Sequence, residues 1–194
     1  MTLSVIPDPI LPEVLHVLPV RHVDPRGWFT ESYNEAAFRQ AGIGVTFVQD
    51  NHSLSERAGT VRGLHFQRAP HAQAKLVRCL RGRILDVVVD LRVTSSRFGK
   101  FTAFELSAEK GNQAFVPAGF AHGFCTLEDG CEISYKVDAY YSPECDAGVA
   151  YNDPGIGIIW PFPESELLLS AKDRQLPRLK DLSPQDRLAF GDNG

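Results

Sequence analysis

The chain has 194 residues, of which 43% are hydrophobic and 23% are charged, enough for one well-buried core but short for two. The formal net charge of -4 and the pI near 5.9 offer no overall attraction to a phosphate backbone, so nucleic acid is not an expected partner. We therefore expect a single domain over 1–194, with an extended, proline-rich arm at 1–12 and a frayed end at 190–194.

The cysteines and the chain start indicate the compartment. The four cysteines contain no C-x-x-C pair, which argues against both a zinc site and a disulfide framework. The first residues, MTLSVIPDPILPEV, have no basic stretch followed by an apolar run, and no 18 consecutive apolar residues occur anywhere. We expect a cytoplasmic protein that has no membrane partner.

Short β-branched or aromatic runs dominate the chain, separated by turn residues. One helix is predicted early, over 35–41 (EAAFRQA), with Asn34 as its N-cap and Gly42 closing it. A second short helical turn is predicted over 183–190 (SPQDRLAF). Strands are predicted within 47–55, 75–80, 83–92, 100–107, 112–117, 122–127 and 131–141. Many short strands at this spacing are typical of a β-sandwich or barrel.

Alternation within the predicted strands places polar groups on apolar faces. In the strand predicted over 83–92, the odd-numbered residues from Leu85 to Leu91 are all apolar and form one face, whereas Asp86 and Asp90 lie on the other face. Lys75 shares its face with apolar alternate neighbours, and Tyr135 does the same in its own strand. These titratable side chains indicate a polar site inside the barrel.

Each of these residues also has a purely structural interpretation. The aliphatic part of Lys75 could run along the barrel wall so that its ammonium group reaches solvent at the rim. Tyr135 could simply pack in the core with its hydroxyl hydrogen-bonded, and Asp86 could lie near a turn. Asp173 ends the sequence SAKD (170–173), which matches the capping box of a helix start. No single residue decides between the two interpretations.

His65, in TVRGLHFQ (60–67), could be a metal ligand, an acid/base group or a satisfied core histidine. Barrels that hold a metal commonly place two histidines two residues apart on one strand, but here the second position is Gln67. Pairing with His71 would cross an expected turn at 69–70. We therefore expect no metal, and favour proton transfer, since an imidazole titrates near pH ~6.5.

Longer motifs occur in order along the chain: DPRGWFTE (24–31), QDNHSLS (49–55), GTVRGLHFQ (59–67), QAKLVRCLRGRILDVVVDLR (73–92), FVPAGFAHGF (115–124), YKVDAYYSP (135–143), YNDPGIGIIWP (151–161) and LSAKD (169–173). Together they resemble the dTDP-4-dehydrorhamnose 3,5-epimerase family, from about Glu13 to about Pro177. The resemblance implies an all-β, cupin-like jelly roll (double-stranded β-helix) with a few short peripheral helices. It also implies a homodimer that needs no metal or other cofactor, and we expect each N-terminal segment to contribute to the neighbouring subunit's site.

The resemblance further implies a reaction, the inversion of C3 and C5 in dTDP-4-dehydro-6-deoxy-D-glucose to give dTDP-4-dehydro-L-rhamnose, for L-rhamnose and cell-surface polysaccharide biosynthesis. His65 matches the family's base and Tyr135 its acid. Lys75 matches the group beside the enolate oxygen. Asp173 matches the aspartate that pairs with the histidine, and Asp86 matches a further buried acid, expected to tune Lys75 or a nearby histidine.

The binding residues that the resemblance implies hold the nucleotide and the sugar, with arginines suited to a diphosphate. They are Arg26, Phe29, Glu31, Gln49, Asn51, Arg62, His122, Tyr140, Asp146 and Lys172. Tyr140 resembles the ring that stacks on thymine, and Phe29 is expected to line the same pocket. Asp146 stands where many members have glutamate, which leaves open the contact that this shorter side chain makes.

Other functions remain open at this level. They are an epimerase that acts only at C3 or only at C5 in an unusual deoxysugar pathway, a cupin-like ketoisomerase, and a sugar-nucleotide binder without activity. The combination of a base, an acid and an oxyanion partner favours an enzyme over a binder. The order of the two inversions and the downstream sugar are not encoded in any motif that we identify.

Overall fold

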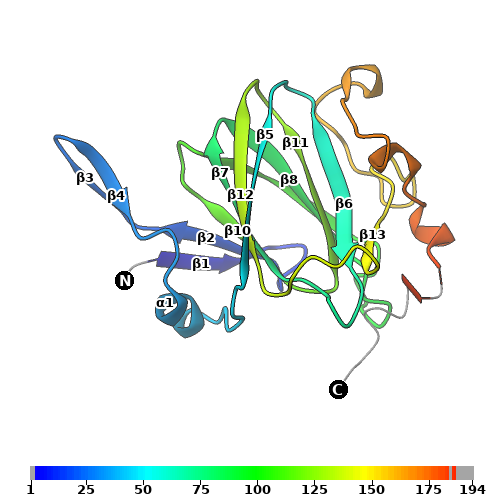
Figure 1. Ribbon diagram of the computed structural model, residues 1–194, viewed down its shortest axis with the longest axis horizontal. Coiled ribbons are helices and arrows are strands. Elements are labelled where there is room, and N and C mark those ends of the chain that lie inside the picture. Colours follow the sequence, from blue (N-terminus) through cyan, green and yellow to red (C-terminus); the bar gives the residue numbers. More distant parts are fainter. Residues whose placement is uncertain (1–2, 184, 187–194) are drawn as a thin grey trace.

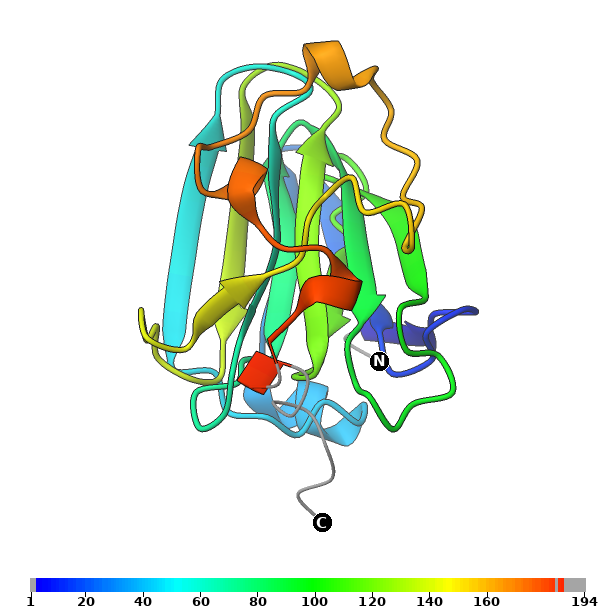
Figure 2. The ribbon, with the colours of Figure 1, turned by 90° about the vertical axis from the view of Figure 1, so that its right-hand side faces the viewer.

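The computed structural model describes residues 3–183, 185 and 186, and two facing β-sheets form its centre (Figures 1 and 2). One sheet has the order β1-β2-β10-β7-β12-β5. Its strands are β1 (Leu3–Pro7), β2 (Leu15–Pro19), β10 (Gln113–Val116), β7 (Lys75–Arg81), β12 (Cys131–Val137) and β5 (Gln49–Ser55). The other has the order β13-β6-β11-β8-β9. Its strands are β13 (Asp146–Gly148), β6 (Val61–Gln67), β11 (Phe120–Thr126), β8 (Arg83–Asp90) and β9 (Phe101–Ser107).

Successive strands alternate between the two sheets for much of the chain. From β5 to β8, and again from β10 to β13, each strand lies in the sheet opposite its predecessor. This alternation is the winding of a double-stranded β-helix, so the predicted jelly roll is confirmed. Within the described residues the two sheets are not joined edge to edge, and β5 and β13 are edge strands.

The main core lies between the sheets and obeys the predicted strand phases. Val77 and Ile133 of one sheet are fully buried in a cluster with Val88 of the other. Val87, on the alternate face of β8, packs in a second cluster with Val149, so the chain after β13 covers the outer face of the five-stranded sheet. Full burial of each such side chain contributes roughly 1.5–3 kcal/mol. The polar groups that share these faces are therefore surrounded by packed apolar side chains.

Short peripheral elements complete the fold. The helix α1 (Glu35–Gln40) begins where predicted, with the Asn34 Oδ1 accepting a hydrogen bond from the Ala37 N–H at 3.2 Å. The hairpin of β3 (Arg21–Asp24) and β4 (Gly27–Thr30) projects away from the sheets (Figure 1). Three 3-10 helices follow β13, namely η1 (Glu164–Glu166), η2 (Asp173–Gln175) and η3 (Leu179–Asp181). Among all the residues that the structure describes, no helix has the length and apolar content that a membrane crossing requires.

The ends of some elements differ from expectation. The strand predicted over 131–141 ends at Val137, where the next side chain, Asp138, accepts a hydrogen bond from the Ala74 N–H. The N-terminal arm is extended over Leu3–Pro7, but it pairs with β2 of its own chain as an edge strand. The helical turn predicted over 183–190 and the end at 190–194 lie largely or wholly outside the described residues.

Candidate active site

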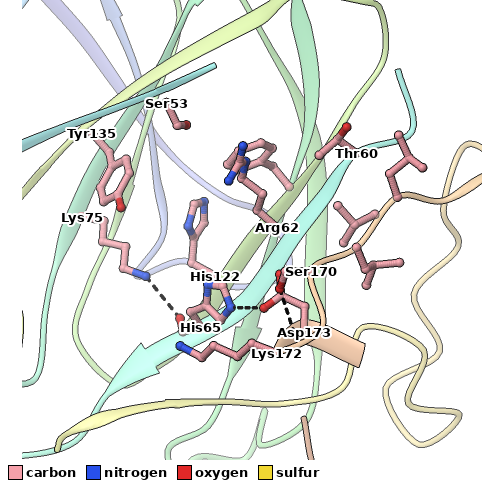
Figure 3. Close-up of a pocket in the computed structure, with 14 residues that line it drawn as sticks. Ser53, Thr60, Arg62, His65, Lys75, His122, Tyr135, Ser170, Lys172 and Asp173 are labelled. Atoms are coloured by element: carbon pink, nitrogen blue, oxygen red, sulfur yellow. Dashed lines mark hydrogen bonds and ion pairs between the residues drawn. The ribbon is translucent and has the colours of Figure 1, made fainter. Parts of the chain in front are cut away.

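A cavity of about 450 Å³ opens between the sheets and gathers most of the predicted catalytic side chains (Figure 3). Seven predicted site residues line it: Arg62, His65, Lys75, His122, Tyr135, Lys172 and Asp173. They come from β6, β7, β11 and β12 and from the turn that leads into η2. Segments more than 100 residues apart in the sequence therefore converge on one site.

His65 and Asp173 form a hydrogen-bonded pair at the wall of this cavity. The His65 Nε2 lies 2.7 Å from the Asp173 Oδ1, and the Asp173 carboxyl is almost fully buried. Burial alone would raise the pKa of Asp173, but the hydrogen bond and charge of His65, with backbone and serine donors, hold it below its usual value. The aspartate is therefore ionised at neutral pH and can orient the imidazole.

The capping interpretation of SAKD is half right. The Ser170 Oγ accepts a hydrogen bond from the Asp173 N–H at 3.0 Å, as a cap would. The carboxylate, however, reaches His65 instead of closing the box. The serine therefore shapes the turn that presents Asp173 to the histidine.

A second histidine-carboxylate pair lies deeper in the cavity. The His122 Nε2 is 2.8 Å from the Asp86 Oδ1, and both side chains are buried. The strand register is consistent with the contact, because His122 of β11 lies opposite Val88 of β8, and Asp86 is two residues from Val88 on the same face of that strand. The other carboxyl oxygen, Oδ2, is buried without a hydrogen-bond partner among the described residues. Asp86 thus places a buried carboxyl group behind His122, which lines the cavity.

Lys75 occupies the polar position on the apolar face of β7 that alternation predicts. Its Nζ donates a hydrogen bond to the His65 backbone oxygen at 3.2 Å, and the side chain is 8% exposed. Burial lowers its pKa from 10.5 to about 8, although the negative charges of Asp86 and Asp146 oppose this. The ammonium form still prevails at neutral pH, and its proton is easier to share than that of a surface lysine.

Tyr135 projects into the cavity from β12, in the sheet opposite His65 (Figure 3). Burial raises the pKa of its hydroxyl, with the charge of Asp146 adding to the rise and that of Arg62 opposing it. The phenol is therefore protonated at neutral pH. It can donate a proton from the side opposite the imidazole.

A smaller cavity of about 220 Å³ adjoins the first, sharing His65, Lys75, Tyr135 and Lys172 with it. Its remaining wall contains Asp146 together with Tyr141, a residue that the sequence-based reasoning did not identify. The Tyr141 hydroxyl donates a hydrogen bond to the Asp146 Oδ2 at 3.0 Å, and the Lys172 Nζ forms an ion pair with the same oxygen. The duplicated tyrosine in DAYYSP was the available signal, and only its first member was singled out.

Gln49 and Asn51 lie beside the cavities on one face of β5. Asn51 is paired in register with Tyr135, and the Gln49 amide donates to the Asn51 side-chain oxygen at 2.9 Å. Ser53, two residues further on the same face, lines the main cavity and was not predicted. Tyr140 is 67% exposed near this edge. These polar groups lie next to β12, the strand that carries Tyr135.

The remaining predicted residues lie elsewhere. Arg26 is in the turn of the β3–β4 hairpin, where its guanidinium pairs with Asp24, and Phe29 is 70% exposed on β4. Glu31 follows this strand directly. None of the described residues that line the two cavities comes from this hairpin. One chain alone therefore brings together only part of the predicted binding set.

Among the described residues, no group of three or more His, Cys, Asp or Glu side chains could hold a metal ion. His65 has Lys75 and Asp173 as its polar partners, and His122 has Asp86. Independence from metal stays a prediction for measurement.

Comparison with known proteins gives the family. The profile described as dTDP-4-dehydrorhamnose 3,5-epimerase matches residues 9–181, which is most of the chain. The chain belongs to this family. A relative in Sinorhizobium fredii, named dTDP-4-dehydrorhamnose 3,5-epimerase, is 52% identical over 170 residues, covering 88% of this chain and 87% of its own. The resemblance inferred from the motifs is confirmed.

Solved structures support the same family assignment. The epimerase of Bacillus anthracis, solved with TDP and pyrophosphate bound, is 46% identical with a TM-score of 0.87, over 91% of this chain and 99% of its own. A 3'-monoepimerase from Streptomyces bikiniensis, solved with dTDP-quinovose, is 35% identical with a TM-score of 0.84, over 95% and 91%. The epimerase fold therefore also serves single-position chemistry.

Proposed function

We propose that this chain is a dTDP-4-dehydrorhamnose 3,5-epimerase, which inverts C3 and C5 of dTDP-4-dehydro-6-deoxy-D-glucose to give dTDP-4-dehydro-L-rhamnose. The observation that carries the proposal is the placement of the His65–Asp173 pair and Tyr135 on opposite walls of one cavity, with Lys75 between them (Figure 3). Relatives of that name at about 50% identity support it.

The chemistry requires two faces of the sugar to be served. The C4 ketone acidifies the hydrogens on C3 and C5, because removing either gives an enolate whose negative charge resides largely on the C4 oxygen. Inversion then requires a proton to return to the same carbon from the opposite face. A base and an acid on facing sheets match this requirement, whereas two groups on one sheet would return the proton to the side that it left.

We assign the steps as follows. His65, oriented by Asp173, takes the proton from carbon, and Tyr135 returns a proton to that carbon from the other side. Lys75 donates a hydrogen bond to the enolate oxygen, which stabilises an anion that the substrate itself lacks. His122, paired with Asp86, adds a second polar group near the same oxygen. One proton is removed and one returned per inversion, so no redox partner is needed.

Binding is assigned to the cavity, to the polar residues beside it and to a second subunit. Arg62, His122 and Lys172 line the cavity and are suited to the sugar and the diphosphate, and Gln49, Asn51 and Tyr140 stand beside it for the base. The exposed hairpin, with Arg26, Phe29 and Glu31, is proposed to complete the site of a partner in a homodimer. Its exposed aromatic and aliphatic side chains support this, because a soluble monomer rarely leaves such a projection uncovered.

The proposal includes a cytoplasmic location and no cofactor. The four cysteines are free and buried, which fits a reducing compartment. Nucleic acid and membranes are not proposed as partners, in line with the net charge of -4.

The deciding experiment is turnover of dTDP-4-dehydro-6-deoxy-D-glucose by the purified protein in D2O. Mass spectrometry and NMR should find solvent deuterium at both C3 and C5 of a product with the L-rhamno configuration. Label at one carbon alone would identify a single-position epimerase, as the S. bikiniensis structure makes conceivable. Movement of the carbonyl would identify a ketoisomerase, and binding without exchange a non-enzymatic binder.

A further inference from the structure

Asp146 is the centre of a charged cluster at the wall of the smaller cavity. Its Oδ2 accepts a hydrogen bond from the Tyr141 hydroxyl at 3.0 Å and is paired with the Lys172 ammonium. The Asp146 side chain is 14% exposed, whereas Tyr141 is 57% and the Lys172 side chain 54% exposed, so the carboxylate is shielded while its two partners reach the solvent. Hydrogen bonds to charged groups are stronger than neutral ones.

The backbone ties this cluster to the histidine pair. Asp146 begins β13, which runs antiparallel to β6 with Asp146 opposite Gln67 and Gly148 opposite His65. Lys172 directly precedes Asp173 in the chain. The Asp146–Lys172 ion pair therefore joins the strand that neighbours His65 to the turn that carries its aspartate. It is a second link alongside the His65–Asp173 hydrogen bond.

Tyr141 extends the cluster to the other sheet. Its backbone N–H donates to the Gln49 Oε1 at 3.2 Å, while its hydroxyl reaches Asp146. Gln49 belongs to β5, the edge of the six-stranded sheet, and Asp146 to β13, the edge of the five-stranded sheet. Tyr141 thus bridges two strand edges that have no backbone pairing with each other.

We propose that Tyr141 and Asp146 are positioning residues that, through Lys172, hold the Asp173 turn against His65 and fix the open edge between the two sheets. The inference rests on the proposed function, because it assigns these residues to the geometry of its base. It also gives the short Asp146 side chain a role that does not require contact with substrate. A displacement of the imidazole by about 1 Å is enough to cost a large part of the rate.

The charge of Asp146 has a separate effect that a structural role alone would lack. Asp146 raises the pKa of both Lys75 and Tyr135. Lys75 faces Asp86 from β8 as well as Asp146 from β13, and it shares the cavity with His65, His122 and Tyr135. Removing the Asp146 charge should therefore lower the pKa of Lys75 further. The alkaline limb of the rate profile, where Lys75 loses its proton, would move to lower pH.

The test compares Tyr141→Phe, Asp146→Asn and Asp146→Glu with a matched control, Tyr151→Phe. The control removes another tyrosine–carboxylate hydrogen bond, from the Tyr151 hydroxyl to Glu164 at 2.8 Å, outside both cavities. Tyr141→Phe should lower kcat about 10-fold with KM changed less than about two-fold, as expected for one lost hydrogen bond to a charged group. Asp146→Asn should lower kcat and also shift the alkaline limb, and Asp146→Glu should restore that limb. Tyr151→Phe should leave kcat unchanged.

Thermal unfolding first establishes that all variants are folded, and the remaining outcomes of the kinetic comparison then contradict the inference as follows. Equal kcat in Tyr141→Phe and Tyr151→Phe would overturn the inference. So would a rise in KM at constant kcat, since that would identify Tyr141 and Asp146 as substrate contacts. An unmoved alkaline limb in Asp146→Asn would also contradict it. Absence of exchange at both carbons in the wild-type protein would instead refute the proposed function itself.

Discussion

His65 and Tyr135 enter one cavity from opposite sheets, His65 from β6 of the five-stranded sheet and Tyr135 from β12 of the six-stranded sheet. Their surroundings differ as well, because His65 is hydrogen-bonded to the ionised Asp173, whereas burial raises the pKa of the Tyr135 hydroxyl. In the proposed mechanism, His65 accepts a proton and Tyr135 supplies one. Substitutions at the two positions should therefore have different consequences.

His65→Ala and Tyr135→Phe should fail at different stages. His65→Ala is expected to lose both inversions and all uptake of solvent deuterium, with binding of dTDP nearly unchanged, because no base remains. Tyr135→Phe is expected to retain some wash-out of substrate hydrogen, because abstraction survives while delivery to the opposite face is impaired. NMR of substrate recovered from D2O measures both. Equal, complete loss of exchange in the two variants would contradict this division of roles.

Asp173→Asn should lower the rate of exchange at both carbons by roughly 10²–10⁴-fold, since the amide cannot support the protonated imidazole. It should also change the acid stability. The folded state holds the pKa of Asp173 below its unfolded value near ~3.9, so its contribution is present above that pH and is lost as the pH falls through the lower folded value. Urea titrations from pH 3 to pH 7 should find the wild-type advantage only at the upper end. A constant difference across that range would show that Asp173 titrates normally.

Lys75→Met should produce a protein that is more stable but less active. The pKa of Lys75 falls from 10.5 to about 8 on folding, so the unfolded chain binds more protons between these values and stability rises with pH across that window. Below about pH 8 the folded protein bears the full cost of burying the charge, on the order of 3 kcal/mol. Methionine removes this cost while keeping most of the side-chain volume.

The same variant should slow exchange at C3 and C5 together, by roughly 10²–10³-fold, because one donor serves the enolate formed on either side of C4. Lys110→Met is the matched control, since Lys110 is exposed and pairs only with Glu105 among the described acidic residues. Denaturant unfolding at pH 7 and exchange in D2O measure both effects. A destabilised Lys75→Met, or loss of exchange at one carbon only, would sink the prediction.

Alternation alone predicted the strand faces of several polar residues correctly. Lys75 and Tyr135 lie on inward faces of β7 and β12, and Asp86 lies inward on β8, because the two-residue period of a strand is set locally and survives folding. The helix at α1 was equally accessible, since its cap is a local contact. What alternation could not supply was the pairing of His65 with Asp173, 108 residues apart. That pairing came from the family resemblance.

Features that depend on tertiary or quaternary geometry were not accessible in this way. Tyr141 became part of the smaller cavity because β12 ends at Val137, and the residues after it leave the strand period on which the sequence reasoning relied. The β3–β4 hairpin carries predicted binding residues, yet its position relative to a cavity depends on which subunit supplies that cavity. No pattern within one chain encodes that choice.

A complementation experiment decides the place of the hairpin. We expect Arg26→Ala/Phe29→Ala to be nearly inactive, because the site of each subunit would lack the arginine and the aromatic ring supplied by its partner. His65→Ala is inactive for a different reason, its own cavity having no base. In a mixed dimer with two-fold symmetry, the cavity of the hairpin variant receives the intact hairpin of the His65→Ala subunit. One of the two sites is then complete.

Random exchange of equal amounts makes half of the dimers mixed, so the mixture should recover about one quarter of the wild-type activity per subunit, and each variant alone almost none. Activity is measured after unfolding and refolding the two proteins together, with each variant refolded separately as the control. If the hairpin instead serves the cavity of its own chain, every cavity in the mixture carries one of the two defects and no activity returns. Light scattering that reports an active monomer would likewise exclude the shared site, because a monomer has no partner to supply Arg26 and Phe29.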